Sequence, residues 1–501
     1  MAPRSWLPVF LLLVAPAVAS AQVSAYLPLD DSRLPLIEHL IATGAIADPS
    51  PFIRPFRRGD LLRVLADADT TRPGVAEMKR QMEEEFAVLS GESTWGVDLR
   101  GGLQAYTHAR RDPLHPAGDG GVQPYAEVGL EASAGPVVLV ARPVLEPRLL
   151  DDPDWKGRKD IEVSFRMADG YISAQWKPAR IFYGQMAQNW GPVGITGLAL
   201  GNESYPRPTF GVDFYFGPFH LAGQASDLND QTDTLSQVVH RYFFAHRLDL
   251  RASKRLQFGL FETTVLSGVD RNFDGRYRNP VSLLLLTNEY GLGDDGNVLA
   301  GLDASWQVAT AFTFQAELLL DDIQYQNRSG PDSYPDRYAF TVAGFGPLGR
   351  ALSYRVLYSQ VSSLAFRTED PFNNFVDDGV GIGRNFGGND QFTVRVGIPV
   401  RHSWLVTPEL TYFRQGEGNL TDAAPARGPI SASYPTLLAG VVEKTFRAAV
   451  AASGSWGPLR LSADAGYHHI TNLDHQTGVS ADRFEGRLFA TLGFSRRGSF
   501  Q

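Results

Sequence analysis

The sequence of 501 residues contains no cysteine. This absence excludes disulfide bonds, thiol chemistry and cysteine-ligated metals. Basic residues are also in deficit, because 46 Lys and Arg face 55 Asp and Glu, which gives a formal net charge of −9. Proteins that bind nucleic acid normally carry a basic patch, so we expect no nucleic-acid partner.

Long apolar runs are missing after the N-terminus. The first residues contain a basic Arg4, a short apolar stretch and small side chains at 19–21. These three parts predict a secretory signal peptide, residues 1–21. No later run approaches the roughly 20 apolar residues that a membrane-spanning helix needs. We therefore expect an exported protein without a transmembrane helix.

Catalytic signatures are absent as well. The chain has no G-x-S-x-G, no H-E-x-x-H and no P-loop sequence. His468 and His469 are adjacent in a strand-like run, so their side chains point to opposite faces and do not share a metal. We predict no catalytic residues and no enzyme activity, and no cofactor apart from a candidate Ca²⁺ near Asp270.

What the sequence does contain, from residue 94 onward, is a hydrophobic period of two. In GVDFYFGPFHLAGQA (211–225), Phe214 and Phe216 alternate with Asp213 and Tyr215, and the Gly-Pro pair suits a tight hairpin turn. The same test identifies about 18 strand-like runs. They are 94–110, 121–134, 137–149, 161–176, 179–190, 209–216, 219–228, 241–252, 256–267, 297–308, 311–325, 336–345, 350–361, 389–399, 403–414, 436–453, 458–469 and 482–494.

The connections between these runs alternate strictly between tiny turns and long loops rich in Asp, Asn, Gly and Pro. Short turns at one rim and long loops at the other are typical of outer-membrane barrels. Lipid satisfies no backbone polar group, so a spanning sheet must close on itself, with apolar side chains outside and polar ones inside. We predict an all-β transmembrane fold, an 18-stranded antiparallel outer-membrane β-barrel over residues 93–501.

One run fits this alternation poorly. Within 256–267, Glu262 falls on the same face as the apolar Phe258 and Leu260. A β-bulge, or a position at the rim of the barrel, would explain a charged residue there.

Residues 22–92 show a helical period instead. Three short amphipathic segments, with Leu36, Leu40 and Met78 among their apolar residues, predict a small helical bundle. A bundle of this size has a thin core, so we expect it to dock on the barrel. The alternative is an independent, linker-like domain. An even number of strands places both termini at the short-turn, periplasmic rim and the long loops outside the cell. The bundle is therefore a candidate plug for the lumen.

The longest loop, 268–296, holds the sharpest local pattern. Asp270, Asn272 and Asp274 match the beginning of a calcium-binding loop, but Val281 stands where the ligating Glu is required. An Asx-rich hairpin turn explains the same residues. Candidate polysaccharide-binding residues in this loop are Arg271, Arg276, Tyr277 and Arg278, because Arg and Tyr suit acidic sugars and stacking on sugar rings. They are equally well explained as solvated loop charges.

Three segments resemble a known family: QNWGPVGITGLALGNESYPRPTFGVDF, RNPVSLLLL…DDGNVLAGLDASWQV and AELLLDDIQY. With the helical N-terminal part, they are similar to the Wzi capsule-assembly family. The resemblance implies an 18-stranded outer-membrane barrel, a periplasmic-side helical bundle and a lectin-like role that holds capsular polysaccharide at the cell surface. Trp190, in Trp-Gly-Pro, is a further candidate sugar contact. The alternative for Trp190 and for the sequence Leu-Asp-Asp at 320–322 is a folding role, at the start of a loop and the end of a strand.

Two main functions remain open from the sequence: polysaccharide anchoring and a porin or solute-uptake channel. A purely structural or biogenesis role is a third alternative. Anchoring predicts a lumen closed by the bundle and by inward-folded loops such as 268–296. A channel predicts an open constriction ringed by charged side chains. Parity places Arg395 and Arg487 inside the lumen. Expected partners are outer-membrane lipid, capsular or extracellular polysaccharide and the barrel-assembly machinery, for a chain that acts as a monomer.

Overall fold

The computed structural model describes residues 23–72, 74–86, 93–272, 296–323, 334–400, 403–426 and 428–500. The predicted signal peptide, residues 1–21, lies outside them. None of the described helices is long and apolar enough to cross a bilayer.

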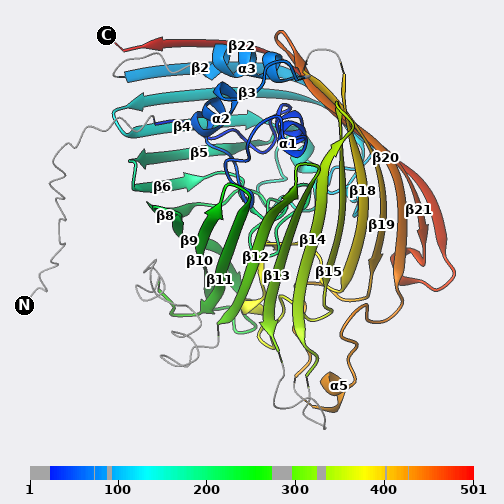
Figure 1. Ribbon diagram of the computed structural model, residues 1–501. Helices are drawn as coiled ribbons and strands as arrows, with labels where there is room; N and C mark the ends of the chain where they lie inside the picture. Colours follow the sequence, from blue (N-terminus) through cyan, green and yellow to red (C-terminus); the bar gives the residue numbers. More distant parts are fainter. Residues whose placement is uncertain are drawn as a thin grey trace, which may run out of the picture.

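Eighteen antiparallel strands form a closed barrel, in which each strand pairs with the next along the chain and β22 pairs with β2 (Figure 1). The predicted fold class is therefore confirmed. The strands are β2 (Ser93–Tyr106), β3 (Gly121–Ala134), β4 (Val137–Leu145), β5 (Phe165–Gln175), β6 (Ala179–Gln185), β8 (Thr209–Phe216), β9 (Phe219–Thr232), β10 (Val238–Ser253), β11 (Leu256–Gly268), β12 (Asn297–Ala309), β13 (Phe312–Asp322), β14 (Arg337–Leu348), β15 (Leu352–Val361), β18 (Asn389–Val400), β19 (Trp404–Gln415), β20 (Glu443–Trp456), β21 (Leu459–Thr471) and β22 (Ser480–Ser499).

The alternation of side chains separates the two surfaces of the sheet. In the β8–β9 hairpin, Phe214, Phe216 and Phe219 are exposed on the outside of the barrel, while Asp213 is buried on the lumen side. Gly217 turns the chain between the two strands with φ 61°, which glycine adopts without a Cβ clash. Exposed aromatic and aliphatic side chains recur in this way around the barrel, as lipid contact requires.

The charged residue on the outer face of β11 has a different explanation from the bulge considered above. The ladder between β10 and β11 is regular through the pair His246 and Glu262. The Glu262 Oε1 lies 3.2 Å from His246 Nδ1, so the carboxylate has a partner on the neighbouring strand. The bulge alternative at this position is therefore wrong. In its pairing with β11, β10 shifts register between Arg251 and Ser253 instead.

The N-terminal domain contains three helices among its described residues: α1 (Leu34–Ala42), α2 (Arg58–Ala66) and α3 (Val75–Phe86). Gly44, with φ 66°, follows the end of α1. The helices share a small apolar core that also includes Leu405 of β19. Figure 1 shows them inside the ring of strands. The barrel wall thus completes a core that the helices are too small to form alone.

Ion pairs attach this domain to the wall at the short-turn end. Arg33 contacts Asp31 and Glu85, at 2.6 Å in each case, and Arg460 of β21 contacts the same two carboxylates at 3.2 and 2.7 Å. Burial raises the pKa of Glu85, but the charges of Arg33 and Arg460 outweigh it and lower that pKa to about 2. The pKa of Asp31 is lowered by the same two arginines against the effect of burial.

These shifts predict that the docking of the N-terminal domain depends on pH. A carboxyl whose pKa is lowered on folding stabilises the folded state above its unfolded pKa, and this contribution is lost as pH falls through the folded value. We expect hydrogen exchange in α3, corrected for its intrinsic rate, to increase between about pH 5 and about pH 2 while the barrel strands stay protected. Glu85→Gln should show the faster exchange already at the higher pH.

The matched control is Glu84→Gln. Glu84 is exposed, and its ion pair among the described residues is with Arg80 of the same helix. This substitution should therefore leave hydrogen exchange in α3 unchanged. Equal exchange for Glu85→Gln and the wild type would contradict the prediction.

Candidate functional site

The chain that follows β6 turns into the lumen. Residues Asn189–Trp190 form the short strand β7, which pairs with β1 (Ile53–Arg54) of the N-terminal domain. Trp190 is opposite Ile53 in this pair and is only 2% exposed. A strand from the short-turn end and a segment between two barrel strands therefore meet inside the barrel.

The segment after Trp190, which we call loop 191–208, is held against the wall by two side chains of β13. The Glu317 Oε1 accepts a hydrogen bond from the backbone N–H of Leu198 at 3.0 Å, and the Gln315 Oε1 accepts one from Val193 N–H at 3.0 Å. Gln315 also donates to the carbonyl of Pro51 at 3.2 Å. Gln315 thus contacts both the loop and the N-terminal domain.

A second segment, loop 362–388, also folds inward. It contains the short strands β16 (Val376–Asp377) and β17 (Val380–Gly381). The guanidinium of Arg241 on β10 donates to the carbonyls of Phe372, Asn374 and Val376 at 2.7–2.9 Å. These bonds satisfy backbone carbonyls that would be costly to bury unpaired.

The strand end predicted at 320–322 contributes to the same attachment. β13 ends at Asp322, and the Asp321 Oδ2 accepts a hydrogen bond from the backbone N–H of Phe366 at 2.7 Å. The folding role that we considered for this sequence is thus supported by a specific contact with loop 362–388.

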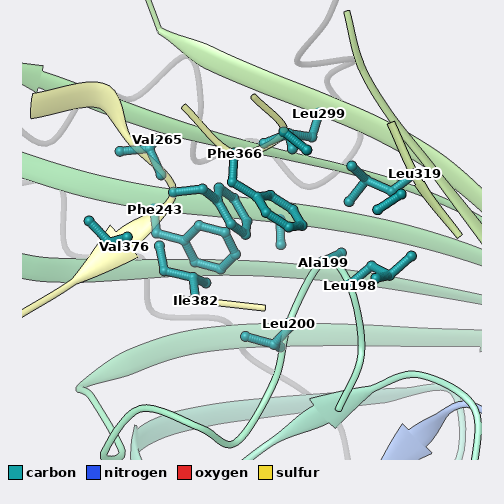
Figure 2. Close-up of a cluster of buried hydrophobic side chains, with 14 of the residues drawn as sticks. Leu198, Ala199, Leu200, Phe243, Val265, Leu299, Leu319, Phe366, Val376 and Ile382 are labelled. Atoms are coloured by element: carbon teal, nitrogen blue, oxygen red, sulfur yellow. The ribbon is translucent and has the colours of Figure 1, made fainter. Parts of the chain in front are cut away.

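An apolar cluster fills the space between the two loops and the wall. Figure 2 shows side chains of loop 191–208 and loop 362–388 beside those of the lumen wall. Each large apolar side chain buried in this way contributes about 1.5–3 kcal/mol relative to exposure. The members are Leu198, Ala199 and Leu200; Ala365, Phe366, Phe375, Val376 and Ile382; and the wall residues Leu228, Phe243, Ala245, Phe261, Val265, Leu299, Leu319, Ala339 and Val361, with Trp190 and Leu420.

The sequence analysis predicts inward-folded loops such as 268–296 but does not identify these two segments. Residues 273–295 lie outside the described part of the chain, so the prediction for that loop stays a prediction. The signal that could have identified the actual inward loops is their apolar content, GITGLALG at 194–201 and FVDDGVGIG at 375–383. Runs of this kind in a long loop are costly to leave in water.

Two adjoining cavities lie in the lumen along the strands β18 to β22, beside loop 107–120. Residues of loop 191–208 and loop 362–388 also line the first cavity. One has a volume of about 210 Å³ and the other about 230 Å³. We call them together the arginine vestibule. The first is lined by Arg384, Arg395 and Arg447 with Asp112, Glu203, Glu409 and Asp464; the second by Arg110, Arg111 and Arg487 with Asp112, Asp464 and Glu485.

The predicted lumen positions of Arg395 and Arg487 are confirmed, because each lines one of the two cavities. Arg395 pairs with Glu409 across the ladder at 2.6 Å. Arg447 contacts Glu409 at 2.6 Å and also pairs with Asp464. These ion pairs hold the wall of the vestibule in place.

Loop 107–120 forms the roof between the cavities. His115 Nδ1 lies 2.5 Å from Asp112 Oδ2, and its ring stacks on Phe386 of loop 362–388 with 3.4 Å between ring centroids. Burial raises the pKa of Glu203, and the charge of Asp112 adds to this shift. Burial also acts on Asp112, but the charge and hydrogen bond of His115 lower the pKa of Asp112 to about 2.

The predicted site residues that the structure describes lie outside the vestibule. Arg271 follows β11, and its Nε donates to the carbonyl of Ser267 at 2.9 Å. Asp270 and Asn272 are exposed. The remaining loop candidates, Asp274, Arg276, Tyr277 and Arg278, lie outside the described residues.

The sequence also predicts a sugar contact at Trp190 and a calcium site near Asp270. Trp190 is buried in the apolar cluster, which favours packing over sugar contact. In the described part of the chain, no group of three or more His, Asp and Glu side chains could hold a metal. Both assignments stay predictions.

The hydrogen bonds from β13 to loop 191–208 predict that the loss of one of them loosens the loop from the barrel wall. Glu317→Ala removes the acceptor of Leu198 N–H and leaves a buried donor unpaired, at a cost of about 1–3 kcal/mol. We expect a larger single-channel conductance in planar bilayers than for the wild type, because the loop leaves the lumen more often.

Two further variants make this result specific. Glu317→Gln keeps a carbonyl acceptor and should restore most of the wild-type behaviour. Glu162→Ala, at an exposed loop position, should have no effect. Unchanged conductance in Glu317→Ala would show that this contact does not hold the loop.

Comparisons with known proteins agree with this architecture. The family model "Capsule assembly protein Wzi" matches residues 120–345. No curated protein sequence matches the chain. Among solved structures, Escherichia coli Wzi, described as an outer-membrane protein involved in group 1 capsule assembly and a carbohydrate-binding β-barrel, has 16% sequence identity and a TM-score of 0.62. The similarity covers 94% of this chain and 98% of that one.

Two further solved barrels have lower TM-scores. Pseudomonas aeruginosa OprD has 11% identity and a TM-score of 0.45, over 82% of this chain and 98% of its own. Acinetobacter baumannii OccAB4 has 8% identity and a TM-score of 0.45, over 81% and 99%. The resemblance to the Wzi capsule-assembly family that the sequence indicated is thus confirmed, by the family-model match over residues 120–345 and by the shared barrel fold.

Proposed function

We propose that this outer-membrane barrel binds capsular or extracellular polysaccharide and holds it at the cell surface. The observation that carries the proposal is the β1–β7 pair inside the lumen, where the N-terminal domain meets loop 191–208. The family match supports the same function, since the matching model is that of a capsule-assembly protein. The barrel would act by binding, with no catalytic step and no cofactor.

The alternative is a porin or solute-uptake channel. A channel of this kind needs a continuous aqueous path with a charged constriction. Charged side chains do line the lumen here, but side chains of both loops pack in an apolar cluster against the wall, and the N-terminal domain pairs with β7 inside the barrel. This arrangement favours a binding protein over a channel.

The orientation of the protein in the membrane is part of the proposal. Residues 1–21 would direct export, residues 22–92 would lie at the periplasmic side, and the barrel, 93–501, would present its long loops to the outside. Arg271, Arg276, Tyr277 and Arg278 would then contact polysaccharide from the longest loop. Ca²⁺ at Asp270, Asn272 and Asp274 is not needed for this function.

Trp190 would have a supporting part, because its ring packs at the point where the lumen is crossed. Lipid and the barrel-assembly machinery are the other partners we propose, and a single copy of the chain contains all the elements described.

A strain that lacks this chain tests the proposal directly. We expect the ratio of cell-bound to shed polysaccharide to fall while total synthesis stays unchanged, because the polymer is made but no longer held. The ratio is measured by fractionating washed cells and medium and assaying polysaccharide in each. Expression of the full chain should restore the ratio.

Conductance of the purified protein separates the two functions. Low conductance together with the fall in cell-bound polymer supports anchoring. A normal ratio in the deletion strain, with large stable conductance of the protein, would replace anchoring by the channel.

A further inference from the structure

Three of the six arginines that line the arginine vestibule have no ion pair with any described residue: Arg111, Arg384 and Arg487. Arg384 donates one hydrogen bond, to Gln391 Oε1 at 3.1 Å. Arg487 donates to the backbone carbonyls of Arg110 and Arg111. Carbonyl and amide oxygens satisfy N–H groups but do not neutralise a cation.

Arg111 is arranged in a similar way. Its guanidinium donates to the backbone carbonyl of Glu203 and lies 4.3 Å from the ring centroid of Tyr205. The other three arginines of the vestibule differ, since Arg110 pairs with Asp154 at 3.1 Å and the remaining two pair with wall carboxylates as described above. The vestibule therefore contains two kinds of arginine. Three form ion pairs with carboxylates, and three have no ion pair among the residues that the structure describes.

The environment of Arg384 agrees with this distinction. Burial lowers the pKa of its guanidinium, and the more distant charges of Glu203 and Asp112 offset only part of that effect. A partly desolvated cation gains most from a ligand oxygen that carries charge, and a guanidinium binds a carboxylate through two parallel hydrogen bonds.

The space in front of these arginines is sufficient for a ligand group. One buried water needs roughly 10–15 Å³ by comparable measures, and each of the two cavities is many times larger, at about 210 and 230 Å³. Both cavities are lined by Asp112 and Asp464. A ligand can therefore extend from one cavity to the other past these carboxylates.

The carboxylates restrict the chemistry of the ligand. A densely charged polyanion would be repelled by the acids that share the vestibule with the arginines. A neutral sugar would leave the charge of Arg384 and Arg487 without a counter-ion. A sugar unit with one carboxylate and several hydroxyls fits both conditions, because its hydroxyls donate to the acids while its carboxylate accepts from arginine.

We propose that the arginine vestibule is a binding site for an acidic sugar unit, with Arg384 and Arg487 on its carboxylate. This inference rests on the proposed polysaccharide-binding function and names the class of polymer that the site selects. Arg111 would assist from the roof of the second cavity.

The test uses the purified full chain in detergent and two uronate probes, oligogalacturonate and hyaluronan oligosaccharides, each beside its carboxyl-reduced form. Isothermal titration gives the affinities. We expect at least one uronate probe to bind about tenfold or more tightly than its reduced form. Arg384→Gln and Arg487→Gln should each remove most of that difference and leave binding of the reduced form unchanged.

Arg158→Gln is the matched control. Arg158 is an exposed arginine of a long loop, paired with Asp160 and outside both cavities, so its loss should not change either affinity. Heat-modifiable migration on gels confirms that each variant barrel is folded.

The outcomes separate this inference from the proposed function. Equal affinity for both uronates and their reduced forms, absence of binding to both uronates, or full affinity in Arg384→Gln and Arg487→Gln would each overturn the vestibule assignment. If the cells' own polysaccharide is nevertheless lost to the medium in the deletion strain, anchoring stands without an acidic-sugar site. If it is not lost, anchoring fails while the titrations still decide the inference.

Discussion

The closure of the sheet between β22 and β2 is the constraint on which the other features of this protein depend. Thr94 to Tyr106 pair without interruption with Ser499 to Arg487, so the sheet has no free edge at this seam. Lipid offers no partner for an open edge. Once the sheet is closed, every strand has one side towards lipid and one towards the lumen, and the alternation of the sequence becomes a difference between two surfaces.

The inner surface gathers charges that need partners. Arg247 on β10 is 1% exposed and contacts Asp249 at 2.7 Å and Asp303 of β12 at 2.7 Å. Charges buried to this degree are stable only when the opposite charge and hydrogen bonds accompany them. The same requirement attaches the N-terminal domain, whose Asp31 and Glu85 contact Arg460 of the wall. The lumen is thus held together by paired charges and by the apolar cluster of the two loops.

The apolar and the charged features of the lumen lie along different parts of the wall. The apolar cluster and the β1–β7 pair occupy the lumen beside β10 to β15, while the arginine vestibule lies along β18 to β22. A barrel built in this way places charged groups at fixed positions in the lumen. Strands supply three arginines of the vestibule and loops supply the other three. Under the proposed function, this arrangement suits the selection of one kind of sugar.

The sequence by itself determined the strands, the hairpin at Gly217, the amphipathic helices and the lumen positions of Arg395 and Arg487. All of these follow from local periodicity, since a strand alternates its side chains wherever it is placed. Only the tertiary structure decided which loops enter the lumen, that Glu262 pairs with His246, and which vestibule arginines have no carboxylate partner within the described ranges. Those features depend on contacts between distant residues, such as Glu317 with Leu198, 119 positions apart. Strand register and barrel closure bring such residues together, and no local pattern contains that information.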